Sequence, residues 1–226
     1  YLEDQDMWNL SGIYRDVYLL AKPQAHISDL RVTARLDETF MEGELLINVK
    51  TEQCRDCKIR FDLHVSVEGH VDSKLVATEV SRLGTQIIDE RGRYRDQVRI
   101  NMAVGRVNAW SAETPFLYRF CATLLDANGS ELETEAYWVG FRTIEIVSGQ
   151  LTVNGQPIMI RGVNKHEHDS ERGHVEDLSQ VERDIILMKQ HNFNAVRCSH
   201  YPHQPGFYEV CDRLGMYVVD EANIET

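Results

Sequence analysis

Three short apolar segments in the last third of the chain each run directly into a polar sequence that carries histidine or glutamate. They are residues 158–163 before Asn-Lys-His-Glu-His, 194–198 before Ser-His-Tyr-Pro, and 216–219 before Asp-Glu-Ala-Asn-Ile-Glu. Helical patterns separate them, so the spacing predicts parallel strands, whose carboxyl ends open onto one shared mouth in an α/β barrel. A complete (β/α)8 barrel needs about 250 residues, so residues 143–226 are expected to hold its first three β-strands and two helices.

Both connecting helices have recognisable ends. The first is predicted over 177–190, where apolar residues recur at helical spacing and Asp177 can cap the start. The second is predicted over 205–214, with Pro205 in its first turn and Gly215 as a left-handed C-terminal cap.

The preceding region, residues 25–142, has a different period. Short runs of alternating apolar and polar residues are separated by turn sequences such as Asn128-Gly129, a strong hairpin signal. About seven strands over this length indicate an immunoglobulin-like β-sandwich. The clearest runs are 27–36, 43–50, 59–67, 97–102, 117–126 and 135–141. The chain is therefore expected to be multi-domain, β plus α/β.

Two segments do not fit these domains. Residues 1–24 carry one strand-like run, Ile13–Leu20, which cannot bury itself, so we expect them to be the tail of an upstream domain. Residues 82–96 are long, charged and glycine-punctuated. A loop of this length in a sandwich is either functional or a solvated hairpin tip, and the sequence leaves both open.

Composition limits the classes of partner. The formal net charge is −12, and no cluster of Lys and Arg stands out, which argues against nucleic acid or an anionic membrane surface as a partner. No apolar run approaches the length of a membrane-spanning helix. Cys54 and Cys57 form a single C-x-x-C pair, for which thiols in a reducing cytosol are a better interpretation than zinc ligands.

The polar sequences after the strands contain the candidate site residues. His166 and His168 share a face of an extended segment, so zinc is conceivable, although a buried hydrogen-bonded histidine is the commoner case. His200 stands at the equivalent position after the next strand and can donate to or accept from a polar ligand. Glu225, with Glu221 and Asn223 on the same face, offers hard oxygen atoms that suit Mg²⁺.

A family resemblance rests on several long motifs distributed over the whole chain. The chain resembles the large bacterial β-galactosidases of glycoside hydrolase family 2, and related β-glucuronidases share the His-Glu and Ser-His-Tyr-Pro elements. The matching motifs are Asp6-Met7-Trp8, residues 12–17, 88–92, 161–168, 192–202 and 220–226.

The resemblance implies a domain order and an activity. Residues 1–24 would end a jelly-roll sugar-binding domain, 25–142 would be the immunoglobulin-like sandwich, and 143–226 would start the TIM-barrel catalytic domain. The activity would be retaining hydrolysis of terminal non-reducing β-D-galactose, as in lactose, in the bacterial cytoplasm. A β-glucuronidase and a non-catalytic sugar-binding or scaffold module remain the alternatives.

The resemblance also implies roles for particular residues. His166 and His200 would bind substrate and stabilise the transition state through sugar hydroxyls. Glu225 would be a ligand of Mg²⁺, and Asp6 would bind substrate and Na⁺. Residues 82–96 would cross a subunit interface of a homotetramer. Retaining glycosidases need an acid and a nucleophile about 5 Å apart, and both are expected beyond Thr226, so the isolated chain is predicted to be inactive.

Overall fold

The structure is a computed structural model that describes residues 12–67, 70–83, 87–88 and 94–224. The chain divides into two compact units. The sandwich unit comprises Leu20–Trp110 and Phe116–Pro157, and the barrel unit comprises Tyr1–Leu19, Ser111–Pro115 and Ile158–Thr226.

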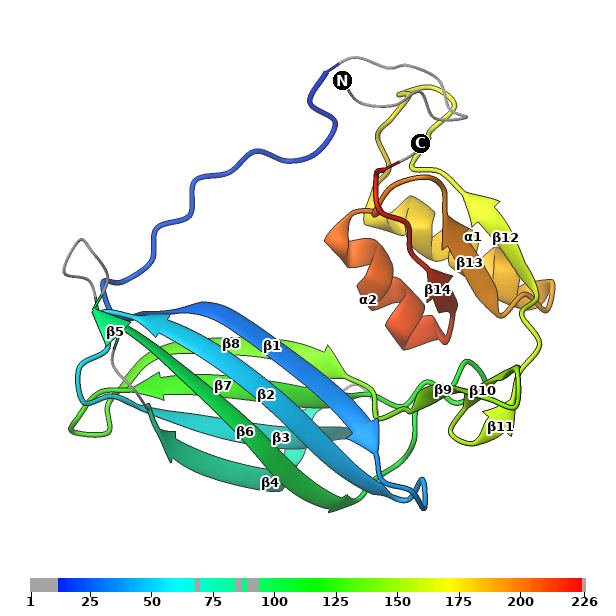
Figure 1. Cartoon of the computed structure of the whole chain (residues 1–226). Coiled ribbons are helices and arrows are strands. Elements are labelled where there is room, and N and C mark those ends of the chain that lie inside the picture. The colour runs from blue at the N-terminus through cyan, green and yellow to red at the C-terminus, as the bar shows by residue number, and fades with distance from the viewer. Residues whose placement is uncertain (1–11, 68–69, 84–86, 89–93, 225–226) are drawn as a thin grey trace. The chain divides into compact units, whose positions relative to one another are not determined.

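The sandwich unit contains two four-stranded antiparallel sheets (Figure 1). The first sheet has the order β1-β2-β6-β5, with β1 at His26–Leu36, β2 at Glu42–Glu52, β5 at Ile87–Ile88 and β6 at Tyr94–Arg106. The second has the order β4-β3-β7-β8, with β3 at Lys58–Val67, β4 at His70–Arg82, β7 at Tyr118–Leu125 and β8 at Glu131–Val139.

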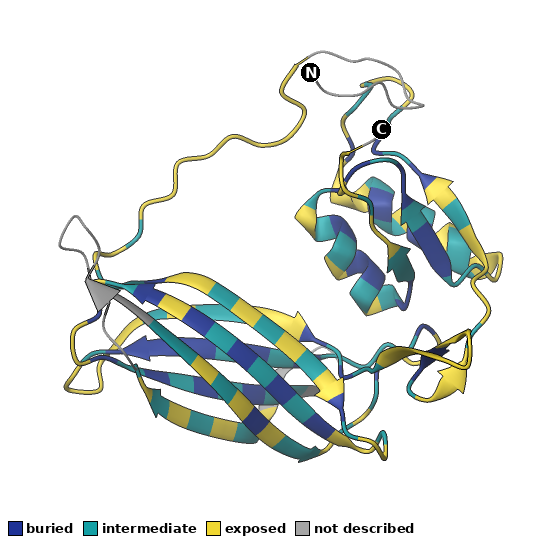
Figure 2. Cartoon of the chain, viewed as in Figure 1, coloured by how far each residue is buried: buried dark blue, intermediate teal, exposed yellow. Residues whose placement is uncertain are grey.

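The core of this unit lies between the two sheets. Strand β2 alternates between buried and more exposed residues, as Figure 2 shows, because side chains on a strand point to opposite faces in turn. Leu45, Ile47 and Val49 of β2 are buried in the same cluster as Phe61 of β3 and Phe120 of β7. The predicted two-sheet sandwich is therefore observed.

A small hairpin sheet completes the sandwich unit. It contains β9 at Ile144–Val147, β10 at Gln150–Val153 and β11 at Gln156–Pro157, all antiparallel. Asn154 and Gly155 both have positive φ, 51° and 72°, as expected for the Asn-Gly turn between β10 and β11.

The barrel unit contains three parallel strands in the order β12-β13-β14. Helices α1 and α2 connect them, which gives the alternation of strand and helix typical of a parallel α/β fold. The bounds are β12 at Gly162–Lys165, α1 at Leu178–Gln190, β13 at Ala195–Cys198, α2 at Pro205–Leu214 and β14 at Tyr217–Val219.

Both helices begin and end where the sequence predicts. The Asp177 carboxylate accepts a hydrogen bond from the Gln180 backbone N–H and so caps α1. Pro205 opens α2, and Gly215 ends it at φ 76°. The buried faces of the helices pack on the sheet around Ile185 of α1, Phe207 of α2 and neighbouring apolar residues.

Three expectations about strands are wrong in detail. The predicted strand Ile13–Leu20 has no regular secondary structure, because no described segment pairs with it and a strand needs a hydrogen-bonded neighbour. The first barrel strand begins at Gly162 rather than near 158. Within 82–96, β4 continues to Arg82 and β6 already starts at Tyr94, so this stretch is not one continuous loop.

Candidate active site

His166 and His200 lie next to each other beyond the carboxyl ends of two neighbouring strands. His166 directly follows β12, and His200 comes two residues after β13. The strands are parallel, and Lys165 pairs with Cys198, so the residues that follow them reach the same level. The two imidazole ring centroids are 5.5 Å apart with planes at 67°. The proximity expected from the sequence is observed, and the role of the two rings stays a prediction.

The environment of His166 favours the neutral form of its ring. Burial lowers the pKa of His166 below its usual value, and the nearby His200, His174 and Arg197 lower it further. A neutral imidazole can both donate and accept a hydrogen bond, which suits it to bind a hydroxyl group.

A carboxylate holds the second histidine. Glu221, two residues after β14, places Oε2 3.2 Å from Nδ1 of His200, and its Oε1 accepts a hydrogen bond of 2.6 Å from Nε of Arg197. The hydrogen bond from Arg197 lowers the pKa of Glu221, and that from His200 adds to the effect. Arg197 is a functional residue that lies inside the apolar segment 194–198, where a charged side chain needs a carboxylate partner.

Glu167 lies on the other side of the site and joins it to the N-terminal part of the barrel unit. Its buried carboxylate accepts hydrogen bonds from the Arg15 guanidinium at 2.9 Å and from the Gln204 backbone N–H. Tyr14, beside Arg15, stacks on His174 with ring centroids 3.9 Å apart. These contacts fix a segment that sequence reasoning treated only as a tail.

The described residues do not support the zinc hypothesis for the His-Glu-His sequence. No group of three or more His, Cys, Asp or Glu side chains among them is arranged to hold a metal ion. Glu221 is engaged by Arg197 and His200 instead of joining a set of oxygen ligands. Cys54 and Cys57 are buried thiols in the sandwich unit. The other predicted ion ligands, Glu225 and Asp6, lie outside the described residues.

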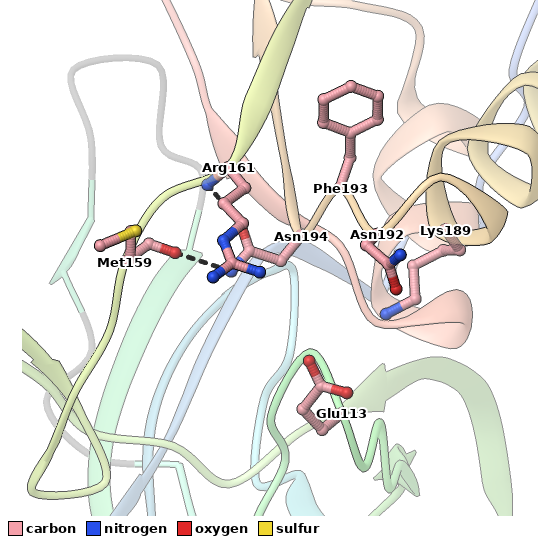
Figure 3. Close-up of a pocket in the computed structure, with 7 residues that line it drawn as sticks. All are labelled: Glu113, Met159, Arg161, Lys189, Asn192, Phe193 and Asn194. Carbon is pink, nitrogen blue, oxygen red and sulfur yellow. Dashed lines mark hydrogen bonds between the residues drawn. The ribbon is translucent and has the colours of Figure 1, made fainter.

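A hollow lies at the amino-terminal ends of the strands, opposite to the paired histidines. Its volume is about 300 Å³, and Figure 3 shows the side chains around it. The Asn194 side chain accepts from the Arg161 backbone N–H and donates to the Met159 carbonyl, and Lys189 donates to the carbonyls of Ala112 and Gly215. These side chains hydrogen-bond to backbone groups of neighbouring loops, so we interpret the hollow as structural. Parallel barrels place their catalytic residues at the carboxyl ends of the strands instead.

His203 is a buried titratable group beneath the site. It is 2% exposed, and its ring lies 4.6 Å from that of Phe207. Burial lowers the pKa of His203 to about 4, although Glu167 opposes the effect. The folded chain therefore binds this proton only in more acidic solution than the unfolded chain does.

This shift predicts a loss of stability in acid. Between the ordinary histidine pKa of 6.5 and about 4, the unfolded state binds the proton and the folded state does not, so the free energy of unfolding falls as pH falls. From pH 7 to pH 5 the wild-type chain should lose about 2 kcal/mol more than His203→Phe. Urea unfolding at both pH values measures this difference. His191→Phe, at an exposed position, should keep the wild-type loss, and equal losses in all three proteins would contradict the prediction.

Two family models together match almost the whole chain. Residues 25–142 match the model described as glycosyl hydrolases family 2, and residues 144–226 match the model described as glycosyl hydrolases family 2, TIM barrel domain. The chain belongs to this family.

Two curated proteins similar to this chain are both named β-galactosidase. The "Beta-galactosidase" of Aeromonas hydrophila subsp. hydrophila is 51% identical over all 226 residues, and that of Pectobacterium atrosepticum is 50% identical. The chain covers 22% of the length of each of these relatives. It is therefore similar to about a fifth of a much longer protein.

Solved structures agree on the fold. A β-glucuronidase of Bacteroides uniformis superposes with a TM-score of 0.78 at 25% identity, covering 94% of this chain and 26% of that chain. A family 2 glycosyl hydrolase of Bacteroides cellulosilyticus superposes with a TM-score of 0.75 at 23% identity, covering 89% and 27%. No helix among the described residues is both long and apolar enough to cross a membrane.

Proposed function

We propose that this chain is the part of a retaining β-galactosidase that contains the end of a sugar-binding domain, an immunoglobulin-like sandwich and the first three strands of the catalytic barrel. The observation that carries the proposal is the identity of about 50% along the entire chain with proteins named β-galactosidase. The paired histidines beyond β12 and β13 support it, because they lie where a parallel barrel places its substrate.

In this function His166 and His200 bind hydroxyl groups of a galactosyl unit. As the sugar ring flattens towards an oxocarbenium-like transition state, its hydroxyls move and these hydrogen bonds strengthen. The acid and the nucleophile are two carboxylates about 5 Å apart in retaining enzymes, and we place both beyond Thr226. Glu221 is assigned neither role in this proposal, and its carboxylate accepts hydrogen bonds from Arg197 and His200.

The proposed function also includes bound ions and partner subunits. Glu225 would hold Mg²⁺ through a carboxylate oxygen, and Asp6 would bind substrate and Na⁺. The full-length protein would be a homotetramer in the bacterial cytoplasm, with residues 82–96 at a subunit interface. Support for these assignments comes from the motifs quoted above, since both ion ligands lie outside the described residues.

A β-glucuronidase is the second candidate. The solved structures of that name share the fold, and the structure from Bacteroides uniformis is 25% identical. The identity with β-galactosidases is twice as high. A non-catalytic sugar-binding module is the third candidate, and it would leave the paired histidines without a reaction.

Substrate assays on the full-length protein separate the three candidates. It should hydrolyse p-nitrophenyl β-D-galactoside with retention at the anomeric carbon and should leave the β-D-glucuronide essentially untouched. The isolated 226-residue chain should show no turnover on either. Hydrolysis of the glucuronide in preference, or no turnover by the full-length protein, would refute the proposal.

A further inference from the structure

The Glu221 carboxylate contacts two polar side chains, that of Arg197 within β13 and that of His200 two residues after this strand. Each of its oxygens has a different partner. Oε1 accepts from both Nε and one terminal nitrogen of Arg197, at 2.6 Å each, whereas Oε2 lies 3.2 Å from Nδ1 of His200. The side chains of Glu221 and His200 are only 26% and 19% exposed, so water does not fully screen the contact.

The sheet register explains why these groups meet. In the parallel ladder Arg197 of β13 pairs with Val219 of β14, and Glu221 is two residues further along the chain. On the other side Arg197 pairs with Asn164 of β12, whose side-chain oxygen accepts a hydrogen bond of 3.3 Å from the guanidinium. Three neighbouring strands therefore hold the arginine, and the arginine holds Glu221 beside His200.

The contact selects one tautomer of the His200 ring. An ionised carboxylate can only accept hydrogen bonds, so the proton must be on Nδ1 of His200. A terminal nitrogen of Arg197 also lies 3.4 Å from Nδ1 of His200. A protonated Nδ1 cannot accept a hydrogen bond from it, and the same nitrogen contacts Oε1 of Glu221. In the tautomer with its proton on Nδ1, the His200 ring has a lone pair on Nε2 that can accept a hydrogen bond from a ligand. The same carboxylate–histidine arrangement orients metal-binding histidines in proteins.

The carboxylate of Glu167 already accepts hydrogen bonds from other groups. Glu167 accepts from Arg15 and from the Gln204 backbone N–H, and it is held by the opposite side of the site. Glu221 is a carboxylate in direct contact with the His200 ring, since its Oε2 lies 3.2 Å from Nδ1.

We propose that Glu221 is a positioning residue, which fixes the orientation and the tautomer of His200 so that Nε2 accepts a hydrogen bond from a sugar hydroxyl. The catalytic consequence rests on the proposed β-galactosidase function, whereas the orientation of the ring does not. Glu221 acts through His200 and need not touch substrate itself.

The kinetic test is a double-mutant cycle in the full-length protein. Glu221→Ala should lower kcat on p-nitrophenyl β-D-galactoside by roughly 10–100-fold, with a KM change of less than about threefold. Glu221→Gln keeps an acceptor for Nδ1 and should recover part of the loss. In the His200→Ala background, Glu221→Ala should cause little further loss, because the ring it positions is gone. Glu182→Gln, in the exposed ion pair with Arg213, is the matched control and should keep wild-type kcat.

A structural readout keeps the test independent of activity. In crystal structures of the full-length protein, Nδ1 of His200 should face Glu221 in the wild type, and the ring should turn or occupy several rotamers in Glu221→Ala while His166 stays in place. An unchanged His200 ring in Glu221→Ala overturns the inference, and so do fully additive losses in the double variant. If the wild-type protein does not hydrolyse β-galactosides, the proposed function fails, and the ring orientation alone decides this inference.

Discussion

Replacing Lys165 with methionine is expected to lower the free energy of unfolding of the chain by about 3–5 kcal/mol. Lys165 is the last residue of β12, and its Nζ donates to Glu176 and, at 2.8 Å, to Asp184 of α1. The side chains of Lys165 and Glu176 are 6% and 1% exposed. Methionine has a similar length without the charge, so the variant leaves a buried carboxylate without its cation, and the desolvation cost of that carboxylate is no longer offset.

Equilibrium urea unfolding of the 226-residue chain, followed by tryptophan fluorescence and circular dichroism, measures this loss. The double variant Lys165→Met/Glu176→Gln removes the stranded charge and should recover part of the stability. The control is Arg213→Met, which breaks an exposed ion pair between α2 and α1 and should cost less than about 1 kcal/mol. A loss below 1 kcal/mol in Lys165→Met would show that this ion cluster does not hold the strand to the helix.

The second large effect concerns turnover. In the full-length protein, His166→Ala or His200→Ala should lower kcat by roughly 30–1,000-fold, equivalent to about 2–4 kcal/mol of transition-state stabilisation. The change in KM should be much smaller, because hydrogen bonds that strengthen as the sugar flattens stabilise mainly the transition state. Steady-state kinetics on p-nitrophenyl β-D-galactoside measure both constants.

A matched control is His191→Ala. His191 lies exposed at the C-terminal end of α1 and should retain wild-type kcat. Variants of His166 and His200 that changed KM alone would show that both histidines contribute only ground-state binding. Glu225→Gln is a further check on the proposed Mg²⁺ ligand, since chelator should then have less effect on the rate.

Local pattern predicted most elements of the fold, because burial follows the period of the chain. The stripe that contains Val181 and Ile185 identified α1, and Asp177 and Gly215 marked helix ends by hydrogen bonding and backbone geometry. Several observed strands are longer than the alternating apolar runs that predicted them. Strand β6 reaches from Tyr94 to Arg106 since backbone pairing continues where side chains become polar, and the edge strand β4 carries too many polar residues to show a clear pattern.

The site was only partly predictable from sequence. Position after a parallel strand was enough to bring His166 and His200 together, because the ladder aligns strand ends. The partners of Arg197 and Glu167 depend on which segments of the chain meet in space. Glu167 bonds to Arg15, 152 residues away, and no local period carries that information.

The contact between Arg15 and Glu167 has a consequence for synthesis on the ribosome. The sandwich unit, residues 20–110 and 116–157, is complete in the nascent chain before β12 emerges, whereas Arg15 must wait for a partner made 152 residues later. At about 5–20 residues per second, that delay lasts roughly 8–30 s. The N-terminal segment is therefore translated early but docked late, and in that interval the sandwich can fold as a separate unit.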